Sequence, residues 1–236
     1  MEIGTTASPP SYAEAVSHTV DDLPQPVILV LDNQSIYAES SPTIKLYEVN
    51  RGIARLGRAT LNVKFSRIER SAGSTNQRSR HIYDLHHTPT LVRIPSTQYA
   101  EYFIEFLAAP ARRLGHLGFK TGHGVPEDWT ALPVDMKGWS ELHNPPFVAG
   151  AAPVFEAHHR SGVCKWMGGN GHDVAVEYDS DPQHRLLVTA SLQRETRDAL
   201  VALWCCRLWQ QSVNRQWATP LMVYSGIFSF RWKKFR

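Results

Sequence analysis

Residues 199–209 read Ala-Leu-Val-Ala-Leu-Trp-Cys-Cys-Arg-Leu-Trp, an apolar run that Arg207 alone interrupts. No Gly or Pro occurs from 193 to 213, and Glu195 and Asp198 suit the positive end of a helix that begins just before them. The pattern therefore predicts one α-helix over about 193–213. Its centre is apolar around the whole circumference, so it must be enclosed by protein on every side.

This apolar run is too short to cross a membrane. Its eleven residues cover about 17 Å as a helix, at about 1.5 Å each, whereas the hydrocarbon core of a bilayer is about 30 Å thick. A second apolar stretch, 217–230, contains Pro220 and Gly226 and is also shorter than about 20 residues. The sequence therefore predicts no transmembrane segment.

The chain before the helix consists of short apolar runs with period-two alternation, separated by Gly, Pro, Asn and Asp. The runs are 27–31, 44–49, 61–70, 80–86, 99–108, 154–158, 173–178 and 184–190. Alternation is clear where Val174, Val176 and Tyr178 share one side of a strand. Ala175 and Glu177 share the other side, and one of the two sides faces inward. The sequence predicts a mainly β fold, a closed antiparallel β-barrel around the buried hydrophobic C-terminal helix.

Composition is that of a soluble globular protein, with 236 residues of which 42% are hydrophobic and 20% charged. The net charge of +3 comes from four basic residues among the last six, so the rest of the chain is close to neutral. A neutral body is not typical of a protein that binds specific nucleic acid. Three cysteines, two of them adjacent, make no disulfide framework, and no secretory signal is visible. A cytoplasmic location is expected.

Residues 1–25 are rich in Ser, Thr, Pro and acids and have few large apolar side chains, so we expect a disordered arm. The arm contains Pro9-Pro10-Ser11-Tyr12, which matches the PPxY ligand of WW domains. In such ligands a polyproline II turn places the prolines and the tyrosine, here Pro9, Pro10 and Tyr12, in aromatic grooves. The motif favours a WW-domain partner, although an ordinary Pro-containing linker could have the same sequence.

Two stretches resemble a known group of proteins. One is Arg-His-Ile-Tyr-Asp-Leu-His at 80–86, and the other is 185–204, where Arg-Leu-Leu-Val-Thr-Ala-Ser-Leu leads into the helix. Both are similar to uncharacterised fungal proteins described as tubby-like. A barrel closed around a hydrophobic helix also resembles the tubby C-terminal domain, the phospholipid scramblases and the LURP-one-related proteins. The resemblance covers about 27–213 without the tubby signature strings or a scramblase calcium segment, and fold alone does not determine activity.

Residues 214–236 extend beyond this resemblance and combine many aromatic residues with four basic residues at the end of the chain. Such a segment could lie at a bilayer interface, pack as a further strand on the barrel, or be the product of an imperfect gene model. We divide the chain into a disordered arm at 1–25, a tubby-like barrel at 26–213 and an aromatic and basic extension at 214–236.

Signatures of catalytic and metal sites are missing from the sequence. It contains no HExxH, no paired CxxC and no G-x-S-x-G. The adjacent residues of His86-His87, and of His158-His159, would face opposite sides of a strand, so each pair offers at most one ligand to a common centre. We expect the histidines at the surface or in loops, no metal or cofactor, and no enzymatic activity.

Two glycine-rich stretches, 115–118 and 168–171, lack the Lys-Ser or Lys-Thr that usually follows a phosphate loop. Asn170-Gly171 indicates instead a hairpin turn that needs a positive φ. This turn would join a strand at 163–167 to the strand at 173–178.

Basic residues are concentrated in 51–80, which contains eight Lys and Arg residues and a single acid, Glu69. If 61–70 and 80–86 form a hairpin, Lys64 and Arg70 share one strand face, and Arg67 points the other way unless a bulge intervenes. Tubby domains bind phosphoinositide headgroups through Lys and Arg on the outer barrel wall. The resemblance therefore implies an anionic phospholipid site, with a solvated basic face as the alternative. Its residues would be Lys64, Arg67, Arg70, Arg78 and Arg80.

These patterns predict a non-enzymatic binding or adaptor module that docks on anionic phospholipid and offers PPxY to a WW-domain protein. One alternative is a scramblase-like lipid transporter, which the lack of a calcium segment and of a spanning helix disfavours. Another is an enzyme with a pocket inside the barrel, which a helix in the lumen would fill. A barrel with no lipid role is the remaining alternative.

Overall fold

The computed structural model describes residues 26–70, 77–88, 98–107, 114–121, 128–137, 139, 144–178 and 183–218. Twelve strands in these segments form one closed antiparallel barrel in which neighbours in sequence are neighbours in space. Strands β1 and β12 close it, with Val27 opposite Val188. The predicted barrel is confirmed. The strands are β1 (Val27–Asp32), β2 (Ser35–Ala38), β3 (Lys45–Val49), β4 (Asn62–Arg70), β5 (Gln77–His87), β6 (Tyr102–Phe106), β7 (Leu117–Thr121), β8 (Asp128–Pro133), β9 (Phe155–Arg160), β10 (Val163–Gly168), β11 (Asp173–Tyr178) and β12 (His184–Val188).

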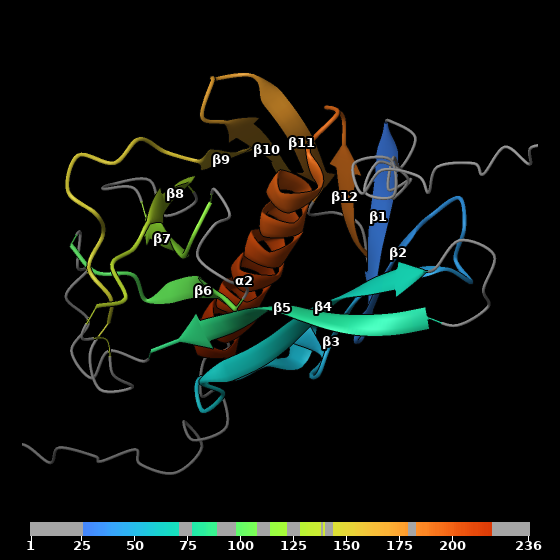
Figure 1. Ribbon diagram of the computed structural model, residues 1–236, viewed down its shortest axis with the longest axis horizontal. Helices are drawn as coiled ribbons and strands as arrows, with labels where there is room; N and C mark the ends of the chain where they lie inside the picture. Colours follow the sequence, from blue (N-terminus) through green and yellow to red (C-terminus); the bar gives the residue numbers. More distant parts are fainter. Residues whose placement is uncertain are drawn as a thin grey trace, which may run out of the picture.

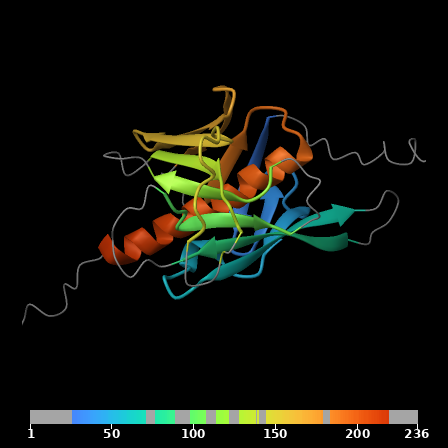
Figure 2. The same ribbon diagram turned by 60° about the vertical axis from the view of Figure 1, so that its left-hand side comes forward.

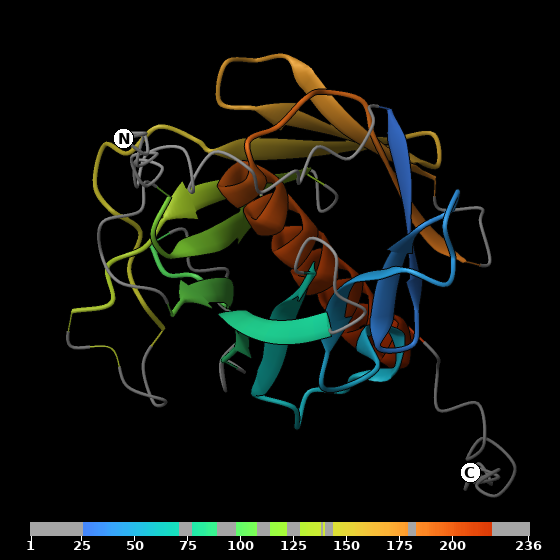
Figure 3. The ribbon, with the colours of Figure 1, turned by 45° about the vertical axis from the view of Figure 1, so that its right-hand side comes forward.

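Helix α2 (Arg194–Ala218) runs through the lumen of this barrel (Figures 1 and 2). Figure 3 shows blue, green and orange strands encircling it. Every residue from 197 to 209 is buried, and Leu200, Leu203 and Trp204 have no solvent exposure. The enclosed helix is thus confirmed, although it continues to Ala218 rather than ending near 213. Among the described residues, no helix has both the length and the apolar character required to cross a membrane.

The second half of α2 is tied to the segment between β3 and β4. A short 3-10 helix, η1 (Ile53–Arg55), lies there. The hydroxyl of Ser212 lies 3.0 and 3.1 Å from the carbonyl oxygens of Ala54 and Leu56, which share its single proton. Since these bonds satisfy backbone acceptors that the loop would otherwise leave open, they fix this end of the helix within the barrel.

The inward face of β11 is the side that carries Glu177. Tyr178 is 50% exposed and Val176 is half-buried, whereas Ala175 and Glu177 are buried, and of the other side only Val174 is buried as well. The physical reason is an ion pair in the lumen between Glu177 and Arg207, the single charged residue in the apolar run of α2. A buried arginine needs a buried acid, and this requirement outweighs the burial of Val176 and Tyr178.

Several strands lie where the sequence showed no clear pattern, namely β2, β7 and β8. The predicted turn after β10 is confirmed, and Gly171 there has a φ of 78°. A second, smaller apolar group packs on the outside of the barrel, because Phe103 on β6 points away from its buried neighbour Ile104. We call this group the outer cluster. It consists of Ala100, Phe103, Val134, Met136, Trp139 and Phe147.

Candidate anion-binding surface

The hairpin predicted for the basic segment is confirmed and is longer than expected. Strand β4 pairs with β5 from Asn62 opposite His86 to Arg70 opposite Gln77. Figure 2 shows the ends of these two strands projecting from the barrel. We call this pair of strands, residues 62–70 and 77–87, the β4–β5 ribbon. Residues 71–76, which connect them, lie outside the described residues.

A β-bulge in this ribbon decides which side chains share a face. Phe65 pairs with Tyr83 and Ser66 with His81, so Ile82 is an extra residue on β5. Because the bulge is on β5, the alternation of β4 continues without a break.

The alternation of β4 separates its basic residues. Lys64 and Arg70 are exposed on the outer face, as predicted. Arg67 faces the interior and is only 5% exposed. Its guanidinium pairs with Asp198 of α2 and with Glu69. Arg67 therefore neutralises acids of its own barrel and contributes nothing to the outer surface.

Arg80 shares the face of Arg67, because the two residues are directly opposite in the ribbon. Its Nη1 lies 3.3 Å from Oε1 of Glu69, and its side chain is 40% exposed. Burial alone would raise the pKa of Glu69, but the bonds and charges of Arg67 and Arg80 outweigh it and hold this pKa below its usual range. Glu69 thus stays ionised and offsets part of the charge of Arg80.

The remaining predicted residues, Lys64, Arg70 and Arg78, have exposed side chains that form no ion pair with any described residue. Arg70 and Arg78 lie together at the end of the ribbon, opposite Gln77 and Glu69 respectively, on its two faces. Lys64 is six residues from Arg70, about 20 Å along the strand at about 3.3 Å per residue. The three cations therefore cannot grip one small headgroup, but they can contact one extended anionic surface.

A buried polar network lies beneath the ribbon, where α2 begins. The hydroxyl of Tyr47 donates to Oδ1 of Asp198 at 2.9 Å and accepts from Nε of Arg197 at 3.4 Å. Burial raises the pKa of both Tyr47 and Asp198, with Arg67 opposing the effect at Asp198. The network anchors α2 to the inner wall, so we interpret it as structural.

The sequence identified Asp198 only as an acid suited to a helix start, and it missed Tyr47 altogether. The available signal was Arg67, an arginine at an inward position of β4, since such a residue requires a buried acid. The prediction that histidines lie at the surface or in loops is wrong for His86 and His87, which are buried in β5. The motif at Pro9, Pro10 and Tyr12 and the end of the extension, 219–236, lie outside the described residues.

The geometry of the barrel and of the ribbon does not by itself place the chain in a family. Comparison with protein-family models, with curated proteins and with solved structures gives no match to this chain.

Proposed function

We propose that this protein is a non-enzymatic binding module whose β4–β5 ribbon docks on the anionic phospholipid surface of a membrane from the cytoplasmic side. The observation that carries the proposal is that Arg70 and Arg78 end the ribbon with exposed side chains that form no ion pair with any described residue. An exposed guanidinium without a carboxylate partner is free to bind phosphate oxygens with two parallel hydrogen bonds.

The interior of the barrel supports binding rather than chemistry. Helix α2 fills the lumen, and its residues 197–209 are all buried. A substrate pocket inside the barrel would therefore have to displace the hydrophobic core. The resemblance to tubby domains, which bind phosphoinositides on the outer wall, agrees with an outer surface as the binding site.

The test is sedimentation of the full chain with three kinds of vesicle: phosphatidylcholine alone, phosphatidylcholine with phosphatidylserine, and phosphatidylcholine with phosphatidylinositol 4,5-bisphosphate. We expect the protein to pellet with the anionic vesicles and less so as salt is raised, because surface charges are screened. Each cation near such a surface contributes about 1 kcal/mol, so the double variant Arg70→Gln/Arg78→Gln should bind roughly 30-fold more weakly.

A matched control removes two other exposed arginines. Arg160 and Arg185 are 62% and 38% exposed in their side chains and pair with Asp128 and Glu39. The variant Arg160→Gln/Arg185→Gln loses the same charge, and we expect it to pellet like the wild type. Equal pelleting by both double variants would remove the ribbon as the docking site.

We further propose that Pro9, Pro10 and Tyr12 bind a WW domain. The support is the sequence motif alone. Titration of a peptide spanning 5–16 against a purified WW domain should show saturable binding, which Tyr12→Ala abolishes. If the Tyr12→Ala peptide binds equally well, the motif is an ordinary linker.

A further inference from the structure

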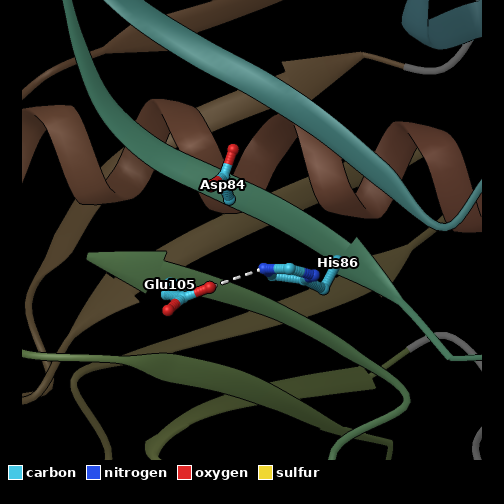
Figure 4. Close-up of side chains that lie close together, drawn as sticks. All are labelled: Asp84, His86 and Glu105. Carbon is cyan, nitrogen blue, oxygen red and sulfur yellow. Dashed lines mark hydrogen bonds and ion pairs between the residues drawn. The ribbon is translucent and has the colours of Figure 1, made fainter. Parts of the chain in front are cut away.

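Three side chains with metal-ligating atoms converge on the outer face of β5 and β6. Asp84 and His86 are two residues apart on β5 and so share one face, and Glu105 on β6 is directly opposite Asp84. One ligand atom from each lies within 4.8 Å of the others. Figure 4 shows the imidazole of His86 and the carboxylate of Glu105 turned toward one another, with Asp84 nearby on β5 and its visible carboxylate oxygen directed away from the pair.

The imidazole of His86 is held in place before any ligand arrives. Its ring stacks on the ring of Phe103, with 4.7 Å between the ring centroids, and forms an edge-to-face contact with Trp139, with 5.0 Å between the centroids. Both aromatic residues belong to the outer cluster. The side chain is only 10% exposed, and Nε2 lies 2.9 Å from Oε2 of Glu105. Since a fixed and mostly desolvated imidazole loses little freedom on ligation, this geometry favours metal binding.

The β-bulge at Ile82 adds an outer-shell partner. Without the extra residue, His81 would face the opposite side from Asp84, because three positions separate them. The bulge turns His81 onto the outer face, where its Nε2 lies 3.0 Å from Oδ1 of Asp84. Carboxylates that bind metal ions are commonly oriented by such a second hydrogen bond.

Charge also favours a cation at this position. Asp84 and Glu105 are directly opposite on neighbouring strands, where like charges destabilise a sheet. Lys64 lies opposite Asp84 on the other side, yet it forms no ion pair with it. A divalent ion between the two carboxylates would offset their repulsion and tie β5 to β6.

We propose that Asp84, His86 and Glu105 bind one divalent transition-metal ion, with His81 as the residue that positions Asp84. Three protein ligands leave at least one coordination position for water. The imidazole nitrogen favours Zn²⁺ over Mg²⁺, which prefers oxygen ligands. No local sequence pattern indicates this site, because the adjacent pair His86-His87 offers at most one ligand to a common centre and Glu105 comes from another strand.

The test uses the full chain without a polyhistidine tag, loaded with Zn²⁺ and dialysed, followed by metal analysis and titration. We expect one Zn²⁺ per chain and a higher melting temperature with Zn²⁺ than with a chelator. Co²⁺ in place of Zn²⁺ should give a visible absorption band. Tighter binding of Mg²⁺ than of Zn²⁺ would overturn the assignment to a transition metal.

The variants Asp84→Asn and Glu105→Gln keep the size of each side chain and weaken it as a ligand. We expect both to lose Zn²⁺ binding by more than about 100-fold, and His81→Gln to weaken it by about 10- to 100-fold. The control Glu156→Gln changes a carboxylate 3.8 Å from His158, outside the three-residue group, and should bind normally.

Failure of the folded wild type to bind Zn²⁺, or equal affinity in the wild type and both amide variants, would overturn the proposal. Neither outcome bears on lipid docking, because Arg70 and Arg78 lie at the end of the ribbon and belong to neither shell of the proposed metal site.

Discussion

The phenol of Tyr47 on β3 donates a hydrogen bond of 2.9 Å to the carboxylate of Asp198, the fifth residue of α2, across 151 residues of sequence. The bond joins the barrel wall to the helix inside it. Because both groups are buried, neither can exchange the bond for one to water. Removing this bond therefore measures how much it stabilises the packing of the start of α2 against the barrel wall.

Tyr47→Phe removes this hydrogen bond and keeps the ring that stacks on Phe65 at 5.3 Å. We expect the free energy of unfolding to fall by about 2 kcal/mol, because a hydrogen bond to a charged group is lost. The buried carboxylate of Asp198 then has one hydrogen-bond donor fewer. Urea unfolding followed by tryptophan fluorescence measures this. Tyr178→Phe, at a 50% exposed position, is the control and should change stability by less than about 0.5 kcal/mol. Equal losses in both variants would contradict the structural role of the bond.

The apolar run of α2 made the fold predictable because enclosure follows from burial alone. An apolar surface must be covered whatever the partner, so 199–209 implied enclosure, and the alternating runs before it identified the cover as a sheet. Burial of apolar residues does not identify the inward face of β11, which carries Glu177. Which acid pairs with Arg207 depends on the register of β11 against the helix, and no local pattern encodes that register.

The basic ribbon shows the same division. Pairing of β4 with β5 and the shared face of Lys64 and Arg70 followed from period-two alternation. The ion pairs that occupy Arg67 and Arg80 depend on Glu69 and on Asp198, 131 residues away. The contact of Arg67 with Asp198 and the bulge at Ile82 are set by tertiary packing, which local sequence patterns do not encode.

Acid should weaken the contact between β8 and β9. Arg160 grips Asp128 with two hydrogen bonds, Nη1 to Oδ1 at 2.9 Å and Nη2 to Oδ2 at 3.0 Å. The hydrogen bond from Arg160, first among several causes, lowers the pKa of Asp128 in the folded state. A lowered pKa adds stability above the unfolded-state pKa, and this stability is lost as pH falls through the folded-state value.

We therefore expect the wild type to be more stable than Asp128→Asn near neutral pH, by less than about 1 kcal/mol for a pair this exposed. The difference should persist from about pH 7 down to about pH 4, the unfolded-state pKa, and shrink as the pH is lowered further. Thermal unfolding of both proteins across this range measures it. In the control Asp173→Asn the lost contact, to Lys165 at 3.8 Å, is longer, so a smaller difference is expected. A difference that grows in acid would contradict the sign of the pKa shift.

Gly118 on β7 marks a close approach between the barrel wall and the outer cluster. A Cβ at this position would lie 2.4 Å from Cβ of Ala100 and 2.8 Å from Cγ1 of Val134. Gly118→Ala should therefore destabilise the protein by about 1–3 kcal/mol through overpacking. In the control Gly57→Ala the nearest atom is the side-chain end of Gln216 at 3.3 Å, which can move aside. Equal urea midpoints for both variants would show that the outer cluster can rearrange around the added methyl group without loss of stability.

The three cysteines should be unreactive in the folded protein. Cys164, Cys205 and Cys206 have no solvent exposure, and burial raises the pKa of Cys205 and Cys206. Since the thiolate is the reactive form, we expect almost no reaction with a disulfide reagent until denaturant is added, and then three thiols per chain. Rapid reaction of the native protein would mean that the barrel opens around α2 on the timescale of the assay.

The ion pair of Arg207 and Glu177 should be costly to break on one side. Arg207 has no exposure, its Nε and Nη1 find no hydrogen-bond acceptor among the described residues, and its charge faces only Glu177 and the ring of Trp129 at 5.2 Å. Glu177→Gln leaves that charge without an acid, and we expect a loss of about 3–5 kcal/mol.

The double variant Glu177→Gln/Arg207→Met removes both charges and keeps an unbranched side chain of similar length in the helix. Urea unfolding should show that it recovers most of the stability lost in Glu177→Gln, because no unpaired charge remains in the lumen. A double variant less stable than the single one would mean that Arg207 stabilises the barrel through its packing on Trp129 rather than through its charge. In that case Arg207 would contribute to stability through packing, and the role of Glu177 would be to neutralise the charge that Arg207 brings into the lumen.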